Sequence, residues 1–65
     1  MNNDRDYWTV EAMRKFGGSF VQILAELASH ADHVNLYKIK ATWPEYWEEY
    51  ERMGITLEKT IAESK

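Results

Sequence analysis

The sequence predicts an all-α fold, a small helical hairpin or three-helix bundle. Apolar residues recur at intervals of three and four along most of the chain, the spacing that places side chains on one face of a helix. Capping and helix-breaking residues divide the chain into segments of helical length. The chain has 65 residues, and a domain of this size buries only about 60% of the surface that its unfolded form exposes. We therefore expect one domain with a thin core, stabilised by helix packing or by self-association into a homo-oligomer.

The first helix is expected to begin at Thr9. The threonine hydroxyl can accept a hydrogen bond from an unpaired amide of the first turn, and Glu11 follows near the positive end of the helix dipole. Residues 1–8 would then form an N-terminal arm.

Two patterns disagree about where this helix ends. An apolar seam favours one long helix, and its members are Val10, Met13, Gly17, Phe20, Leu24, Leu27 and Ala31. Gly17 and Gly18 oppose this, because together they cost about 2 kcal/mol relative to alanine within a helix. Ser19 and Gln22 have the spacing of a capping box, which would start a new helix at Phe20. We expect a break or kink at Gly17-Gly18.

Asp32 is a good N-cap for a further helix that begins at His33. The short turn before it makes this helix an antiparallel neighbour of the preceding one. Pro44 lacks an amide hydrogen and disfavours helical geometry at Trp43, so the helix should break and restart at Pro44 or kink there. The apolar stripe nevertheless continues across the proline, through Leu36, Ile39, Trp43, Tyr46, Trp47, Tyr50 and Met53.

Gly54 is expected to end this helix, and residues 55–65 are expected to form a short, frayed C-terminal segment with few apolar side chains. In the resulting bundle, one row of side chains should face another. The first row is Phe20, Ile23, Leu24 and Leu27, and the second is Leu36, Ile39, Trp43 and Trp47.

Composition excludes several classes of protein. A content of 45% hydrophobic and 14% aromatic residues is too high for intrinsic disorder, and no apolar run approaches the roughly 20 residues of a membrane span. The N-terminus lacks the pattern of a signal peptide and the chain has no cysteine, so a cytoplasmic location is expected. The net charge of −3 disfavours binding to nucleic acid.

The segment from Trp43 to Glu51 is the most unusual part of the sequence, since it combines two tryptophans and two tyrosines with four glutamates. An aromatic stripe of this kind most often packs in a core, with a solvated acidic back. The alternative is a partner-binding surface with aromatic anchors and an acidic rim that selects a basic partner. The candidate residues for that surface are Trp43, Glu45, Tyr46, Trp47, Glu49 and Tyr50.

Catalytic, cofactor and metal sites find little support. Glu26, His30 and His33 are spaced to approach one another on a helix, but a helix end intervenes and no fourth ligand is evident. No nucleophile motif is present, and paired glutamates resemble a solvated helix face. We therefore expect a protein that is not an enzyme and that uses neither a cofactor nor a metal.

The chain resembles small uncharacterised proteins encoded in bacteriophages and prophages in two stretches. The first comprises Asp6–Met13 and Phe16–Val21, and the second runs from Ala31–Asp32 through Lys38–Trp47. The resemblance covers the chain from about Asp6 to Met53, and the string Lys-Ile-Lys-Ala-Thr-Trp-Pro-Glu-Tyr-Trp is its most specific part. It implies expression in a bacterial cytoplasm and no particular activity. Small accessory phage proteins commonly bind a host enzyme or phage machinery, an expectation by analogy.

We therefore expect a non-enzymatic protein-binding module, such as a phage-encoded modulator or inhibitor of a host protein. One alternative is a small helix-turn-helix-like nucleic-acid binder that uses Arg14, Lys15, Lys38 and Lys40. A second alternative is a structural, self-assembling helical protein.

Overall fold

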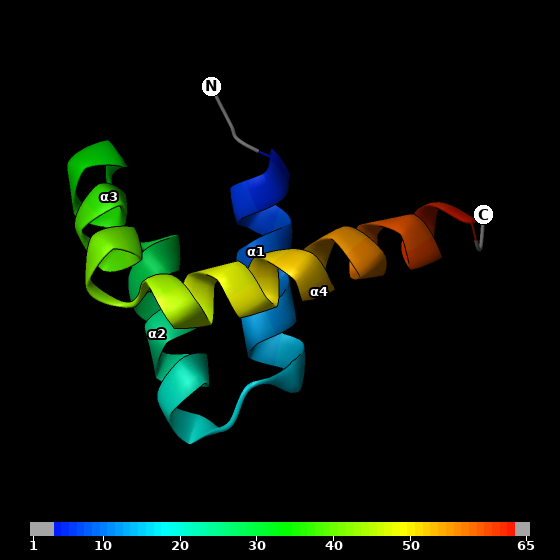
Figure 1. Cartoon of the computed structure of the whole chain (residues 1–65), viewed down its shortest axis with the longest axis horizontal. Coiled ribbons are helices and arrows are strands. Elements are labelled where there is room, and N and C mark those ends of the chain that lie inside the picture. The colour runs from blue at the N-terminus through cyan, green and yellow to red at the C-terminus, as the bar shows by residue number, and fades with distance from the viewer. Residues whose placement is uncertain (1–3, 64–65) are drawn as a thin grey trace.

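The computed structural model describes residues 4–63 and arranges them as four helices (Figure 1). Helix α1 spans Asp4–Phe16, α2 spans Ser19–Ser29, α3 spans His33–Thr42 and α4 spans Pro44–Glu63. The prediction of an all-α fold is confirmed, with four helices and no strand in the described part of the chain. The molecule measures 34 × 29 × 18 Å, so its shortest dimension accommodates two layers of helices, each about 10 Å thick.

The contact between α1 and α4 is the most extensive of the helix pairs, and the two backbones approach closely at Gly54. The two helices cross steeply (Figure 1). A Cβ atom placed on Gly54 would lie 2.7 Å from the Trp8 carbonyl carbon and 3.0 Å from the Thr9 amide nitrogen. The two backbones therefore touch at a point where only a glycine fits. The prediction that Gly54 ends the helix is wrong, and residues 55–63 continue α4 without the expected break.

Thr9 lies within α1 and is not its N-cap. The helix begins at Asp4, so residues 4–8 of the expected arm are helical. The Thr9 hydroxyl donates a hydrogen bond to the Arg5 carbonyl oxygen at 2.7 Å, which satisfies a side chain that is fully buried. Thr9 is thus a small packing residue beside Gly54, a role that depends on α4.

The expected break at Gly17-Gly18 is confirmed. Gly18 is the N-cap of α2, with an extended backbone conformation and no side-chain cap, and α2 begins at Ser19. The predicted capping box does not form, because Gly18 and not Ser19 is the N-cap. The Gln22 side-chain amide donates a hydrogen bond to the Gly17 carbonyl oxygen at 2.9 Å.

Two further helix boundaries agree with the sequence prediction. The Asp32 carboxylate accepts a hydrogen bond from the Asn35 amide at 2.8 Å and caps α3. Helix α4 starts at Pro44 after Trp43 leaves helical geometry. The Trp47 amide still donates to the Trp43 carbonyl oxygen at 3.1 Å, so the two helices join without a loop.

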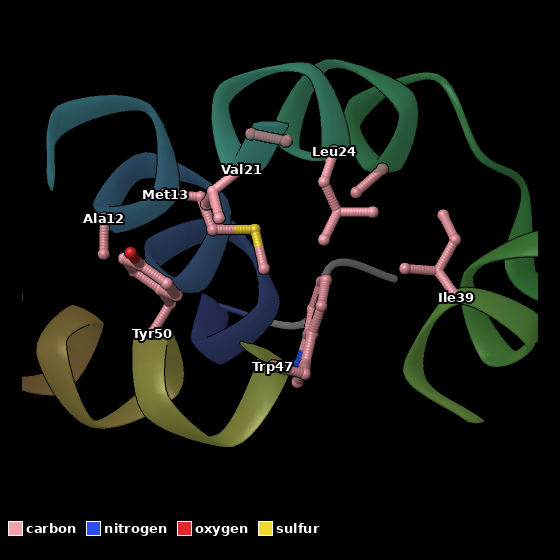
Figure 2. Close-up of a cluster of buried hydrophobic side chains, with 9 residues drawn as sticks. Ala12, Met13, Val21, Leu24, Ile39, Trp47 and Tyr50 are labelled. Atoms are coloured by element: carbon pink, nitrogen blue, oxygen red, sulfur yellow. The ribbon is translucent and has the colours of Figure 1, made fainter. Parts of the chain in front are cut away.

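The core lies where all four helices meet. Met13, Leu24 and Ile39 point toward the ring of Trp47, and Tyr50 lies beside Ala12 (Figure 2). The buried hydrophobic residues are Ala12, Met13, Val21, Leu24, Ala25, Ala28, Ile39, Trp47 and Tyr50. The expected packing of α2 is only partly correct, because Phe20, Ile23 and Leu27 are 52%, 70% and 52% exposed.

The Gly54→Ala variant tests the crossing of α1 and α4. We expect a loss of about 2 kcal/mol or more in the free energy of unfolding, because the added methyl group overlaps backbone atoms that cannot move independently. Urea denaturation followed by circular dichroism measures the change. The control is Gly18→Ser, where no heavy atom lies within 4 Å of the added Cβ, and equal stability of the two variants would contradict the prediction.

The Gly18→Asp variant tests the uncapped start of α2. A carboxylate there can accept a hydrogen bond from a first-turn amide, and the first turn of α2 has no acidic residue. We expect a gain of about 0.5 kcal/mol in the free energy of unfolding at neutral pH. The gain should fall in acid, where the carboxyl group is protonated. Stability equal to or below that of the wild type at neutral pH would show that the position needs its glycine.

Candidate functional site

Two of the predicted partner-binding aromatics lie in the core. Trp47 is 5% exposed and Tyr50 is 9% exposed, and both contribute to the hydrophobic cluster at the centre of the molecule. Their place on one helix face was predicted, and the structure shows that α1, α2 and α3 cover that face. The prediction that Trp47 and Tyr50 are binding anchors is therefore wrong, and both are core residues.

Three other aromatic rings form a contiguous group at the surface, which we call the aromatic corner. Its members are Phe20 at the start of α2, Trp43 at the end of α3 and Tyr46 in the first turn of α4. The centroid of the Phe20 ring lies 6.2 Å from that of Trp43 and 5.6 Å from that of Tyr46. Phe20 and Tyr46 are exposed and Trp43 is half-buried. The rings thus support one another on the surface.

Phe20 was not among the predicted partner-binding residues. On α2 the buried residues Val21, Leu24, Ala25 and Ala28 already form a complete core-facing stripe. Phe20, Ile23 and Leu27 follow the same helical spacing on the adjoining side of the helix. The sequence signal for Phe20 was the width of the apolar arc on α2. An arc wider than one neighbouring helix can cover indicates that part of it faces outward.

An acidic edge adjoins the aromatic corner. Glu45, Glu48 and Glu49 are exposed on α4, and Glu49 follows Tyr46 by three residues, so the two share a side of the helix. Within the described part of the chain, none of these three carboxylates forms an ion pair with a lysine or arginine. We refer to the aromatic corner together with this edge as the aromatic–acidic surface.

A shallow hollow of about 250 Å³ lies beside Leu27, between α2 and α3. Its lining combines apolar and polar side chains, namely Leu27, His30, Ala31, Asn35, Lys38, Ile39, Thr42 and Trp43. Lys38 and His30 are exposed at its rim, and the His30 Nε2 atom lies 3.4 Å from the Glu26 carboxylate. The hollow adjoins the aromatic corner, because Trp43 belongs to both.

The four basic residues of the nucleic-acid alternative do not act as one group. The Lys40 ammonium lies 3.0 Å and 3.1 Å from the two oxygens of Asp6, and it stands 5.4 Å from the centroid of the Trp47 ring. Arg14 pairs with Glu26 at 3.3 Å. The exposed residues Lys15 and Lys38 line different hollows. Two of the four cations are thus already engaged with carboxylates of the chain.

The histidines and acids considered as metal ligands do not assemble into a set. Glu26 lies 3.4 Å from the His30 Nε2 atom and shares its carboxylate with Arg14. Within the described residues, no group of three histidine or acidic side chains is arranged to hold a metal ion. Nor does any described helix have the length and apolarity needed to cross a membrane.

No family model, curated protein or solved structure matches the chain. The phage resemblance therefore stays a prediction.

Trp47→Ala and Tyr46→Ala test the division between core and surface. We expect Trp47→Ala to lower the free energy of unfolding by about 3 kcal/mol or more, because it leaves a cavity where all four helices meet. Tyr46→Ala should cost less than about 1 kcal/mol, because the ring is exposed. Urea denaturation of both variants measures the difference, and similar losses would contradict the assignment of the two neighbouring aromatics.

Proposed function

We propose that this chain is a non-enzymatic protein-binding module that engages a basic protein through the aromatic–acidic surface. The observation that carries the proposal is the group of three mutually supporting rings, Phe20, Trp43 and Tyr46, beside carboxylates that have no partner in the described part of the chain. Aromatic side chains supply most of the binding energy at many protein interfaces.

Preorganisation supports this use of the aromatic corner. Phe20 packs edge-on against Trp43 and tilts against Tyr46, so the rings are already held in place before a partner arrives. Side chains that are fixed in the free protein lose less conformational entropy on binding. A partner can therefore gain apolar contact here at a low entropic cost.

The acidic edge favours a basic partner of defined chemistry. An arginine guanidinium can stack on the face of Tyr46 or Phe20 and also form hydrogen bonds with a carboxylate such as that of Glu49. Exposed carboxylates repel acidic surfaces and accelerate association with basic ones. The phage resemblance adds a context for the partner, which we propose to be a protein of the bacterial host or of the phage, so that the module acts as a modulator or inhibitor.

The experiment is affinity capture from nuclease-treated bacterial lysate with the wild type and two variants. Tyr46→Ala removes a ring of the aromatic corner, and the double variant Glu45→Gln/Glu49→Gln removes two charges of the acidic edge. We expect the wild type to retain one basic protein in stoichiometric amount. We expect Tyr46→Ala to lose it, and the double variant to bind it about tenfold or more weakly in low salt.

Tyr37→Ala is the matched control, because Tyr37 is an exposed tyrosine of α3 outside the aromatic–acidic surface. It should retain the captured protein as the wild type does. Retention by Tyr46→Ala, or equal loss with Tyr37→Ala, would contradict the proposal. Binding of duplex DNA in low salt that is lost in Lys15→Ala/Lys38→Ala would instead favour the nucleic-acid alternative.

A further inference from the structure

We infer that α3 opens as a unit on the rest of the molecule, and that the ion pair between Asp6 of α1 and Lys40 of α3 is the latch that holds it closed. In the open state α3 leaves its seat and unfolds locally, while α1, α2 and α4 stay packed. The latch joins side chains that are 34 positions apart in the sequence. The opening is a motion of the fold and does not depend on the proposed binding of a basic protein.

Three of the helices form a framework that does not need α3. Helix α1 packs extensively on α4 and also on α2, whereas the contacts of α3 with α2 and with α4 are sparse. Within the described part of the chain, Ile39 is the only buried residue that α3 contributes to the core. The crossing at Gly54 and the buried side chains of α1, α2 and α4 therefore remain in place when α3 leaves.

The seat of α3 is incompletely filled. Ile39 borders the hollow of about 250 Å³ between α2 and α3. The half-buried Leu36 borders a second hollow, of about 280 Å³, whose lining includes Val10 of α1 and Ala28 of α2. A side chain beside a hollow has no packing partner on that side and lacks the dispersion contacts of a filled core. The two side chains that α3 packs against the core therefore hold it weakly.

Helix α3 has little stability of its own. It is 10 residues long, and a helix shorter than about 12–15 residues is marginal in water without tertiary contacts. On its outward side, Val34 and Tyr37 are 60% and 72% exposed, so they gain little from burial. Once α3 leaves its seat, we therefore expect its hydrogen bonds to break together, in a unit that opens below the free energy of global unfolding.

The latch compensates for this weak packing. The Lys40 ammonium contacts both oxygens of Asp6, and the Asp6 side chain is 17% exposed. Because water is partly excluded there, solvent and salt screen the attraction less than they screen that of an exposed pair. The same ammonium lies within cation–π distance of the Trp47 ring. Lys40 therefore links α3 to α1 and to α4 at once.

The position of Trp43 depends on whether α3 is closed. The Trp43 amide donates a hydrogen bond to the Ile39 carbonyl oxygen at 3.0 Å, so the last turn of α3 fixes where the indole lies. Opening of α3 breaks this bond and withdraws Trp43 from its place beside Phe20. The latch thereby controls the assembly of the aromatic corner, and the bearing of that control on binding rests on the proposed function.

The first test is amide hydrogen exchange of the wild-type protein, followed residue by residue by NMR. After correction for intrinsic rates, amides from Leu36 to Trp43 should exchange about tenfold or more faster than those of α1 and α4 at their crossing. Low concentrations of urea should accelerate the crossing amides more steeply, because opening of α3 exposes less surface than global unfolding. Equal protection and equal urea dependence in α3 and at the crossing would overturn the inference.

The second test removes the latch. Lys40→Met deletes the charge and keeps the aliphatic stem, so the closed state loses the ion pair and retains the Asp6 carboxylate. We expect exchange of the α3 amides to rise about fivefold or more, because breaking a partly buried pair leaves one charge uncompensated. Asp6→Asn should act in the same direction. The double variant Asp6→Asn/Lys40→Met should accelerate exchange less than the product of the two single effects, because the two side chains act on each other.

Ala12→Gly is the control, because Ala12 is fully buried on α1 and lies beside Tyr50, away from α3 (Figure 2). Glycine destabilises a helix interior relative to alanine, so the amides at the crossing should exchange about fivefold faster. Amides of α3 should stay within about twofold of their wild-type rates, because opening of α3 leaves the surroundings of Ala12 intact.

Three results would contradict parts of the inference. Exchange of α3 that Lys40→Met leaves unchanged, or single effects that multiply in the double variant, would overturn the role of the latch. Acceleration of α3 by Ala12→Gly as large as that at the crossing would show that α3 unfolds only with the whole molecule. A Trp43 amide that exchanges with the crossing and not with α3 would overturn the control of the aromatic corner.

Discussion

The close approach of α1 and α4 at Gly54 holds the remaining parts of the structure in place. Backbone meets backbone there, with Thr9 buried at the contact and Ala12 buried one turn farther along α1. This approach brings Tyr50 against α1 and lets Trp47 reach the side chains of α2 and α3. Helix α4 can then continue past the crossing to Glu63 (Figure 1). A chain with so thin a core relies on one close contact in place of a large apolar volume.

The sequence predicted best those features that depend on neighbouring residues. The break at Gly17-Gly18, the cap at Asp32 and the restart at Pro44 each follow from local backbone chemistry, and all three are present. Thr9 and Gly54 were misassigned because their local signals, an N-cap and a helix end, are overridden by a contact between residues far apart in the sequence. A glycine that admits another helix looks the same in a sequence as one that ends its own.

The candidate site was predictable only in part, for a related reason. Helical spacing correctly placed Trp43, Trp47 and Tyr50 on one face of the chain, but it could not show how much of that face other helices cover. The structure buries the last two and leaves Trp43 beside Phe20 at the surface. Phe20 belongs to an apolar arc on α2 that is wider than the core requires. The arc, the acidic edge of α4 and the hollow beside Leu27 adjoin one another on the surface of the molecule.

The most direct measurement of the central contact is a nuclear Overhauser spectrum of the wild-type protein. If α1 and α4 meet at Gly54 as described, one α-proton of Gly54 points at the backbone of α1 and should show strong cross-peaks to the Thr9 amide proton. The Gly54 resonances should also be shifted by the nearby Trp8 carbonyl group. Absence of these cross-peaks, with helical amide contacts intact on both sides of Gly54, would contradict the account, because α4 would then form without the crossing that organises the core.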